Sequence, residues 1–187
     1  MPTLELAKST TLLKLDLACG QRVKEGFDGV DLYAADAKYK TNLLKFPWPW
    51  KDNSVEEIHC SHFIEHIPMR ETASGQDFLF AFFDEMYRVL SKEGSATVSW
   101  PDLQTTRAFM DPTHRRFIPQ ATMGYLSKTW RVEQKLDHYL VKSDFSVSVT
   151  HTCFIEMTAL HPEAQARRFN ECWNTKFDNV ATLKPIK

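Results

Sequence analysis

The chain has 187 residues, 43% of them hydrophobic and 12% aromatic, and we expect a single domain over residues 1–187. Lys and Arg number 23 against 24 Asp and Glu, so no broad basic surface is indicated and nucleic acid is not the expected partner. The four cysteines form no C-x-x-C pair, the N-terminus lacks a signal-peptide core and no apolar run could span a bilayer, which predicts a reduced, cytoplasmic protein without a membrane partner.

The first third of the chain predicts short strands separated by loops. Residues 12–17 (LLKLDL) are rich in Leu and run into the turn ACG, as a buried strand does where it ends. Residues 27–32 predict a second strand and residues 54–61 (SVEEIHCS) a third. Between them, residues 45–53 contain two prolines and two tryptophans, which predicts a loop.

A helix and a further strand follow. In residues 77–90 (DFLFAFFDEMYRVL) the apolar side chains recur at helical spacing. Asp77 is the expected N-cap of this helix, and Gly94 predicts where it ends. Residues 95–100 (SATVSW) then alternate as a strand does.

The remaining sequence is less regular. Residues 103–143, with two prolines and clustered His and Arg in their middle, predict a lid or substrate arm. Residues 144–157 are β-rich, 162–173 predict a helix and 179–186 a last strand. Strands alternating with helices predict a Rossmann-like α/β fold: an open, mostly parallel sheet with helices on both faces.

In such a sheet, ligands bind at the carboxyl ends of the strands. Asp31 ends the second strand, where a carboxylate can accept hydrogen bonds from both hydroxyls of a ribose. A nicotinamide cofactor favours G-x-G-x-x-G at the first turn, whereas this turn has only Gly20 before Gly26. A nucleoside ligand without phosphates is therefore favoured over a dinucleotide.

Five motifs in order carry a resemblance to a known family. LDLACG, GVDLY, NLLKFPWPWKDNSVEEIHCSHFIEHI, FFDEMYRVLSKEGSATVSWPD and DPTHRRFI span about residues 12–127. Together they resemble the class I S-adenosylmethionine-dependent methyltransferases, most closely a small branch of predicted methyltransferases with a short first loop. The resemblance implies S-adenosyl-L-methionine as the cofactor.

The same resemblance implies which residues contact the cofactor. The turn after the first strand and the end of the third would lie beside the methionine half, and the second strand and the loop after it beside the adenosine half. The implied contacts are Asp16, Ala18, Gly20, Ser61 and His62 for the methionine half, and Asp31, Leu32, Asn42 and Leu43 for the adenosine half.

The chain departs from the family pattern at three places. Ala18 replaces the first glycine of the turn, and Asn42 replaces the usual acid at the adenine edge. Only residues 21–28 separate the turn from the second strand, fewer than a helical crossover needs, so the first helix must be vestigial. We hypothesise that Arg22 or Lys24 supplies the positive charge that a helix N-terminus would otherwise give to the methionine carboxylate.

The implied reaction is a direct displacement of the methyl group onto an O or N acceptor of a small molecule, a sugar or a protein side chain. His66 and His114 are candidate general bases, with Asp111 as an orienting residue. Ala18 and Asn42 leave open a second possibility, a protein that binds the cofactor and has lost catalysis.

Residues 62–66 (HFIEH) also match the H-x-x-E-H pattern of certain zinc peptidases. That pattern requires a helix already running at His62, which would bring His62 and His66 to one face. A strand is predicted to end at residue 61, and Pro68 disfavours helix at the residue before it. We therefore predict no metal ligands and keep a zinc hydrolase as the less favoured alternative.

Overall fold

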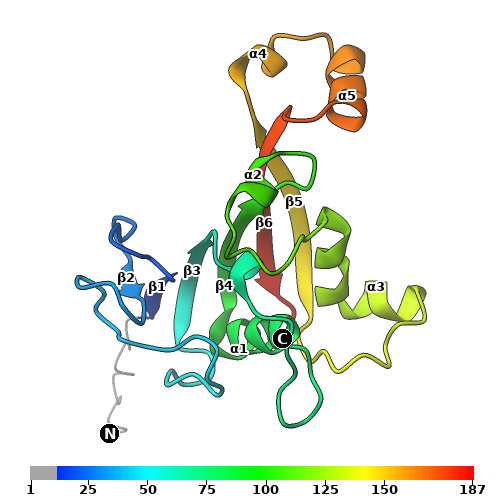
Figure 1. Cartoon of the computed structure of the whole chain (residues 1–187). Coiled ribbons are helices and arrows are strands. Elements are labelled where there is room, and N and C mark those ends of the chain that lie inside the picture. The colour runs from blue at the N-terminus through cyan, green and yellow to red at the C-terminus, as the bar shows by residue number, and fades with distance from the viewer. Residues whose placement is uncertain (1–11) are drawn as a thin grey trace, which may run out of the picture.

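The computed structural model describes residues 12–187, and its centre is a six-stranded sheet in the order β2-β1-β3-β4-β6-β5 (Figure 1). The first four of these strands run parallel, while β6 lies antiparallel between β4 and β5. The predicted open, mostly parallel α/β sheet is thereby confirmed. Its strands are β1 (Leu13–Leu17), β2 (Asp28–Val30), β3 (Val55–Ser61), β4 (Leu90–Pro101), β5 (Phe145–Cys153) and β6 (Lys176–Pro185).

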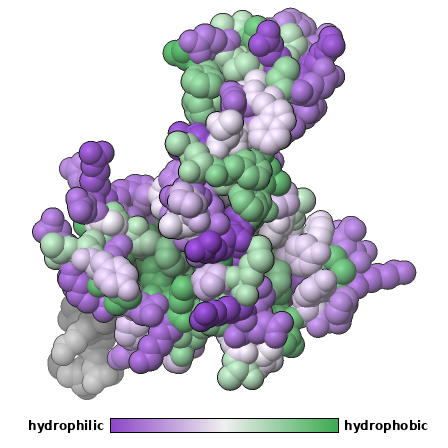
Figure 2. Space-filling view, in the orientation of Figure 1, coloured by the Kyte–Doolittle hydropathy of each residue, from purple (hydrophilic) through white to green (hydrophobic). Residues whose placement is uncertain are grey.

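Between β5 and β6 the chain forms an arm that projects from the rest of the molecule (Figure 1). The arm carries α4 (Ile155–Thr158) and α5 (Pro162–Glu171), and α5 confirms the helix predicted over residues 162–173. The short helix α2 (Arg107–Met110) lies at the base of the arm. Apolar surface gathers around α2 (Figure 2), where Phe109, Met110 and Phe117 are exposed.

The segment over residues 103–143 continues from α2 into η2 (Gln120–Leu126) and α3 (Lys128–Glu133). Part of it belongs to the core, because the side chains of Ile118, Met123 and Leu126 are buried there. A lid or substrate arm in this segment stays a prediction.

The predicted helix over residues 77–90 is confirmed as α1 (Phe78–Val89), and the side chain of Asp77 accepts a hydrogen bond from the backbone N–H of Leu79. The predicted end at Gly94 is wrong, because the chain passes directly from α1 into β4 at Leu90. Gly94 has another use. A Cβ at this position would lie 2.8 Å from the carbonyl oxygen of Glu56, so glycine permits the close approach of β3 to β4.

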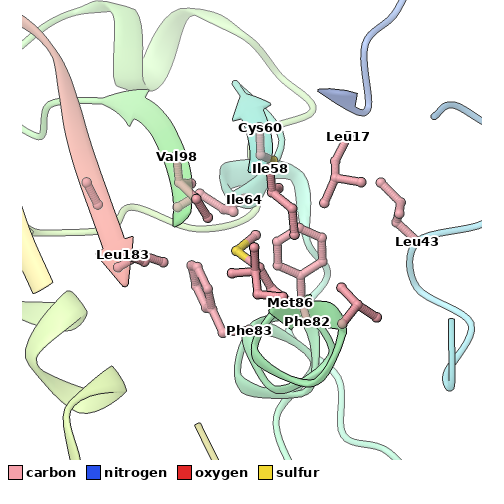
Figure 3. Close-up of a cluster of buried hydrophobic side chains, with 14 of the residues drawn as sticks. Leu17, Leu43, Ile58, Cys60, Ile64, Phe82, Phe83, Met86, Val98 and Leu183 are labelled. Carbon is pink, nitrogen blue, oxygen red and sulfur yellow. The ribbon is translucent and has the colours of Figure 1, made fainter. Parts of the chain in front are cut away.

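The hydrophobic core fills the space between α1 and one face of the sheet (Figure 3). Apolar residues at helical spacing in α1 point at alternate residues of β3, β4 and β6, as an amphipathic helix on a sheet requires. Burial of this set supplies the main driving force for folding. Its members include Phe82, Phe83 and Met86 of α1, and Ile58, Cys60, Val98 and Leu183 of the sheet.

The opposite face of the sheet differs from the prediction of helices on both faces. In residues 12–187 the side chains of this face are mostly polar, with the buried Asp16 and the apolar Val180 among them, and no helix interrupts residues 18–27 between β1 and β2. Phe27 contacts His59 here, with ring centroids 6.3 Å apart, but no crossover helix covers the face, and the strands largely alternate apolar and polar residues accordingly. The face includes Glu57, His59 and Ser61 of β3, Ser95, Thr97 and Ser99 of β4, and Ser148 and Thr150 of β5.

The cysteines and the helices bear on two expectations drawn from composition. Cys19, Cys60, Cys153 and Cys172 are all free thiols, as the absence of a C-x-x-C pair predicts. Burial raises the pKa of the Cys60 thiol, so this side chain packs as a small apolar residue.

None of the helices in residues 12–187 has the length and apolar character needed to cross a membrane.

Candidate active site

A cavity of about 340 Å³ opens where β1 and β2 end. The wall combines residues from the turn after β1, the end of β2, the following loop and the turn after β3. Five residues implied as cofactor contacts line it: Ala18, Asp31, Leu32, Asn42 and Leu43. Tyr33, Thr41, Leu44 and Phe63 line it as well, and the only sequence signal for them is that each neighbours an implied contact.

Asp31 organises the wall of this cavity. Its Oδ1 accepts hydrogen bonds from the backbone N–H groups of Tyr33 (2.7 Å) and Ala34 (2.9 Å), and its Oδ2 accepts one from Gly20 (3.1 Å). Burial opposes ionisation, but these three donors outweigh it and hold the pKa of the carboxyl below its ordinary value. The carboxylate therefore ties β2 to the turn after β1 and presents its remaining acceptor capacity to the cavity.

The two departures in this cavity have structural consequences. Ala18 has φ of +53°, in the left-handed region that favours glycine. Asn42 turns its amide oxygen back to accept from the backbone N–H of Leu44 at 2.9 Å, an arrangement typical of a turn. This bond uses one of the two lone pairs of the amide oxygen, so Asn42 offers a ligand less acceptor capacity than the charged acid that the family pattern has there.

The other four implied contacts do not line this cavity. Asp16 is buried, with its Oδ1 2.7 Å from His59 Nδ1 and its Oδ2 accepting from the backbone N–H of Lys24. Gly20 supports the wall of the cavity through the hydrogen bond that its backbone N–H donates to Asp31. Ser61 accepts a hydrogen bond from Ser99 at 2.9 Å, and His62 lines the neighbouring cavity.

This second cavity, of about 580 Å³, lies between the end of β3, the end of β4 and α2. The two cavities adjoin at the turn after β3, where His62 lines the second cavity and the next residue, Phe63, lines the first. The structure brings all three predicted catalytic residues together here: His66, Asp111 and His114. Glu65 and Arg107 complete the charged lining.

The predicted catalytic groups are connected by hydrogen bonds. His114 Nδ1 donates to the carbonyl oxygen of Ala108 at 2.8 Å. The hydroxyl of Thr113 donates to Asp111 Oδ1 at 2.7 Å and lies 3.0 Å from His66 Nδ1. The hydroxyl and backbone N–H of Thr113 lower the pKa of Asp111.

His62 is a cation beside this cluster. Its interaction with Asp178, followed by that with Glu65, raises the pKa of His62 to about 9 against the opposing effect of burial. Nδ1 lies 3.2 Å from Glu65 Oε1, and Nε2 lies 3.6 Å from Asp178 Oδ2. Its φ of +53° is strained for a residue with a side chain, a feature that clusters at functional sites.

Glu65 and Asp178 are site residues that the sequence reasoning missed. Glu65 was considered only within the zinc pattern, yet its side chain is 2% exposed and lies between His62 and His114. Asp178 reaches the site because β6 pairs with the end of β4, with Asp178 opposite Pro101. No local signal identifies such a long-range neighbour.

The zinc-peptidase geometry is not formed. The helical turn η1 covers only Ile64–His66, so His62 precedes it and the two histidines of the pattern do not share a helical face. This agrees with the expectation that a strand ends at residue 61 and that Pro68 stops the following helix.

No protein-family model matches the sequence, and no curated protein matches it. Among solved structures, the chain is similar to an S-adenosylmethionine-dependent methyltransferase from Archaeoglobus fulgidus, with 15% identity and a TM-score of 0.61 over 94% of this chain and 87% of that one. A second similar structure is an S-adenosylmethionine-dependent methyltransferase from Mesorhizobium loti, with 13% identity and a TM-score of 0.53 over 96% and 93%.

A third is geranyl diphosphate C-methyltransferase from Streptomyces coelicolor A3(2), solved with geranyl diphosphate and S-adenosyl-L-homocysteine. Its identity is 11% and its TM-score 0.53, over 95% of this chain and 73% of that one. At these identities the similarity concerns the fold, and it agrees with the resemblance carried by the sequence motifs. The chain has the fold of the class I S-adenosylmethionine-dependent methyltransferases.

Proposed function

We propose that the protein is an S-adenosylmethionine-dependent methyltransferase that transfers the methyl group by direct displacement to an O or N acceptor of a small molecule, a sugar or a protein side chain. One observation carries the proposal. Two cavities adjoin at the turn after β3, one lined by the residues implied to bind adenosine and the other by His66, Asp111 and His114. A cofactor in the first and an acceptor in the second would meet at this turn, as in-line transfer requires.

On the cofactor side, the chemistry of the wall suits a nucleoside. The ionised Asp31 offers acceptor capacity to a ribose, and the apolar Leu32, Leu43 and Phe63 offer contacts to a flat base. The cavity is also partly open, since Leu32 is 41% exposed. We propose that the methionine half lies toward Gly20, Ser61 and His62.

The methionine carboxylate needs a positive partner because no helix begins after β1 in the described chain. Arg22 and Lys24 are both exposed on this turn, and the ammonium of Lys24 lies 5.0 Å from the centre of the Phe27 ring. We propose that Arg22 makes the larger contribution. Arg22→Ala should therefore weaken S-adenosylhomocysteine binding more than Lys24→Ala, and unchanged affinity in both variants would contradict the hypothesis.

The decisive test is binding of S-adenosylhomocysteine, followed by thermal unfolding and calorimetry. Ligand at ~100 times its dissociation constant should stabilise the folded state by about 2.7 kcal/mol, a shift of roughly 5–10 °C for a chain of this length. In Leu32→Arg a long cation would occupy the cavity wall and abolish the shift. Met69→Arg is the matched control, because Met69 is 71% exposed and lines neither cavity.

A shift in the native chain that disappears in Leu32→Arg and persists in Met69→Arg supports the proposal. Absence of any shift in the native chain refutes it.

A second candidate function is cofactor binding without catalysis. It is favoured by the two departures from the family pattern in the first cavity, the left-handed Ala18 and the uncharged Asn42. It predicts tight S-adenosylhomocysteine binding with no methyl transfer to hydroxyl, amine or carboxyl acceptors. Transfer of labelled methyl groups to any acceptor pool excludes it.

A further inference from the structure

The carboxylate of Glu65 is buried and only partly satisfied. Its side chain is 2% exposed, and Oε2 has no hydrogen-bond partner in the described chain. Oε1 interacts with His62 at 3.2 Å and faces His114 Nε2 at 4.0 Å. A buried carboxylate oxygen without a donor is costly, so a cation or a donor from a ligand is expected beside it.

His114, which faces Glu65 across 4.0 Å, is held in one orientation. His114 Nδ1 donates to the carbonyl of Ala108 at 2.8 Å, and a carbonyl can only accept. The proton is therefore on Nδ1, and Nε2 is the nitrogen that faces Glu65 Oε1 and Asp111 Oδ2, each at 4.0 Å. An N–H donated to a backbone carbonyl is the usual support of a metal-ligating histidine.

His66 is held in a similar way. The hydroxyl of Thr113 gives its proton to Asp111 Oδ1 and can only accept at His66 Nδ1. In the neutral ring of His66 the proton is therefore on Nδ1, and the lone pair is on Nε2. Both imidazoles thus have one nitrogen fixed as a donor to the protein and the other available to a ligand.

We propose that Glu65, His66 and His114 bind a divalent first-row transition-metal ion, with Asp111 as a further ligand. One potential ligand atom from each of the three residues lies within 4.8 Å of the other two. Donor atoms 2.0–2.2 Å from one ion are separated by roughly 3–4 Å, so a small inward movement of the side chains would complete the site.

The kind of ion follows from the ligands. Two imidazoles with one or two carboxylates are the donors of Mn²⁺, Fe²⁺, Co²⁺ and Zn²⁺ sites, whereas Mg²⁺ and Ca²⁺ prefer oxygen alone. Glu65, Asp111 and Asp178 place three carboxylates around the cavity, beside the guanidinium of Arg107. The local charge therefore favours a bound cation.

This site differs from the H-x-x-E-H pattern in the sequence. His62 is not among the ligands, because both of its nitrogens interact with carboxylates, Glu65 and Asp178. It is instead a positioning residue that orients Glu65. His114, which comes from the segment after α2, replaces it in the ligand set.

The inference deepens the proposed methyl transfer and rests on it for the identity of the acceptor. Three or four protein ligands leave coordination positions for oxygens of the acceptor, which favours an acceptor with a hydroxyl beside a second oxygen. A metal-bound hydroxyl loses its proton to water more readily. The resulting oxygen forms the new C–O bond, the C–S bond of the cofactor breaks, and its electron pair remains on sulfur.

Cation binding is tested without turnover. Protein freed of metal by a chelator is titrated with Mn²⁺ in a calorimeter, in the absence of cofactor and acceptor. We expect one saturable site, at least tenfold weaker binding in each of Glu65→Gln, His66→Gln and His114→Gln, and weak binding of Mg²⁺. The matched control is His138→Gln, which removes an exposed histidine outside the cluster and should bind Mn²⁺ as the native chain does.

Far-UV circular dichroism identifies variants that do not fold. His66 is less buried than Glu65, so Mn²⁺ binding by His66→Gln tests the site if the other two variants do not fold. No saturable Mn²⁺ binding, or binding unchanged in the folded variants, overturns the inference. A separate titration with S-adenosylhomocysteine distinguishes the two proposals. Nucleoside binding without Mn²⁺ binding overturns the metal site alone. Mn²⁺ binding without nucleoside binding overturns the methyltransferase proposal alone.

Discussion

Replacing Asp31 with asparagine removes the charge that organises the wall of the cavity at the ends of β1 and β2. The carboxylate accepts three backbone hydrogen bonds, two at Oδ1 and one at Oδ2 from Gly20. In Asp31→Asn the amide oxygen can keep the two bonds from Tyr33 and Ala34. The NH₂ group then faces the N–H of Gly20, so donor meets donor and one bond is lost.

The magnitude follows from these bonds. A hydrogen bond to a charged group contributes roughly 1.5–3 kcal/mol, and the two retained bonds become neutral and weaker. We expect the free energy of unfolding to fall by about 2–3 kcal/mol at pH 7. For a chain of this length that corresponds to a decrease in Tm of roughly 4–12 °C.

The pH dependence has a defined sign. The pKa of Asp31 is lower in the folded chain than its ordinary value of 3.8. Its contribution to stability is therefore complete above pH 3.8 and is lost as the pH falls below that value toward the folded pKa. Asparagine does not titrate, so the stability difference between the native chain and Asp31→Asn should be full at pH 6 and shrink below pH 3.8.

Urea denaturation at several pH values measures this difference. Asp36→Asn is the control, because Asp36 is exposed in the same loop and loses the same charge. An Asp31→Asn variant as stable as Asp36→Asn at pH 7 would refute the argument. So would a difference that grows as the pH is lowered.

Two further substitutions test the backbone around the site and the sheet. Ala18→Gly relieves a left-handed conformation that costs about 1 kcal/mol, but glycine also makes the unfolded chain more flexible, which partly offsets the gain. We expect a free energy of unfolding within ~1 kcal/mol of the native value and tighter S-adenosylhomocysteine binding by calorimetry. Weaker binding would contradict this expectation. Gly94→Ala places a Cβ 2.8 Å from the carbonyl of Glu56, so the free energy of unfolding in urea should fall by about 1–3 kcal/mol; an unchanged denaturation midpoint would show that β3 and β4 can separate freely there.

Local patterns predicted the elements whose signals are local. The helix α1 was found because its apolar residues recur at helical spacing and Asp77 caps it. Gly94 was misassigned because a glycine that ends a helix and a glycine that permits close strand approach look alike in sequence. The alternation in residues 95–100 predicted a strand, which β4 confirms, whereas the polar face that β4 shares with β5 was not predicted.

The site was predictable where the chain is contiguous. Asp31 could be placed at the carboxyl edge of the sheet because parallel strands end together, and the family resemblance implied Asn42 as its neighbour in the site. The role of Glu65 could not, since it depends on His114 arriving from beyond β4 and on Asp178 pairing with Pro101. Such neighbours follow from the register of distant strands, which a single sequence does not specify.

The polar face of the sheet that no crossover helix covers affects how stability varies with temperature. The heat capacity of unfolding rises with the apolar area that unfolding exposes and falls with the polar area. Strands with one solvated face, such as β5 with Ser148 and Thr150 exposed, bury less apolar surface per residue than strands covered on both sides. We therefore expect a heat capacity change below the usual ~12–15 cal/mol/K per residue, and hence a flatter stability curve, with stability that changes little between cold and warm conditions.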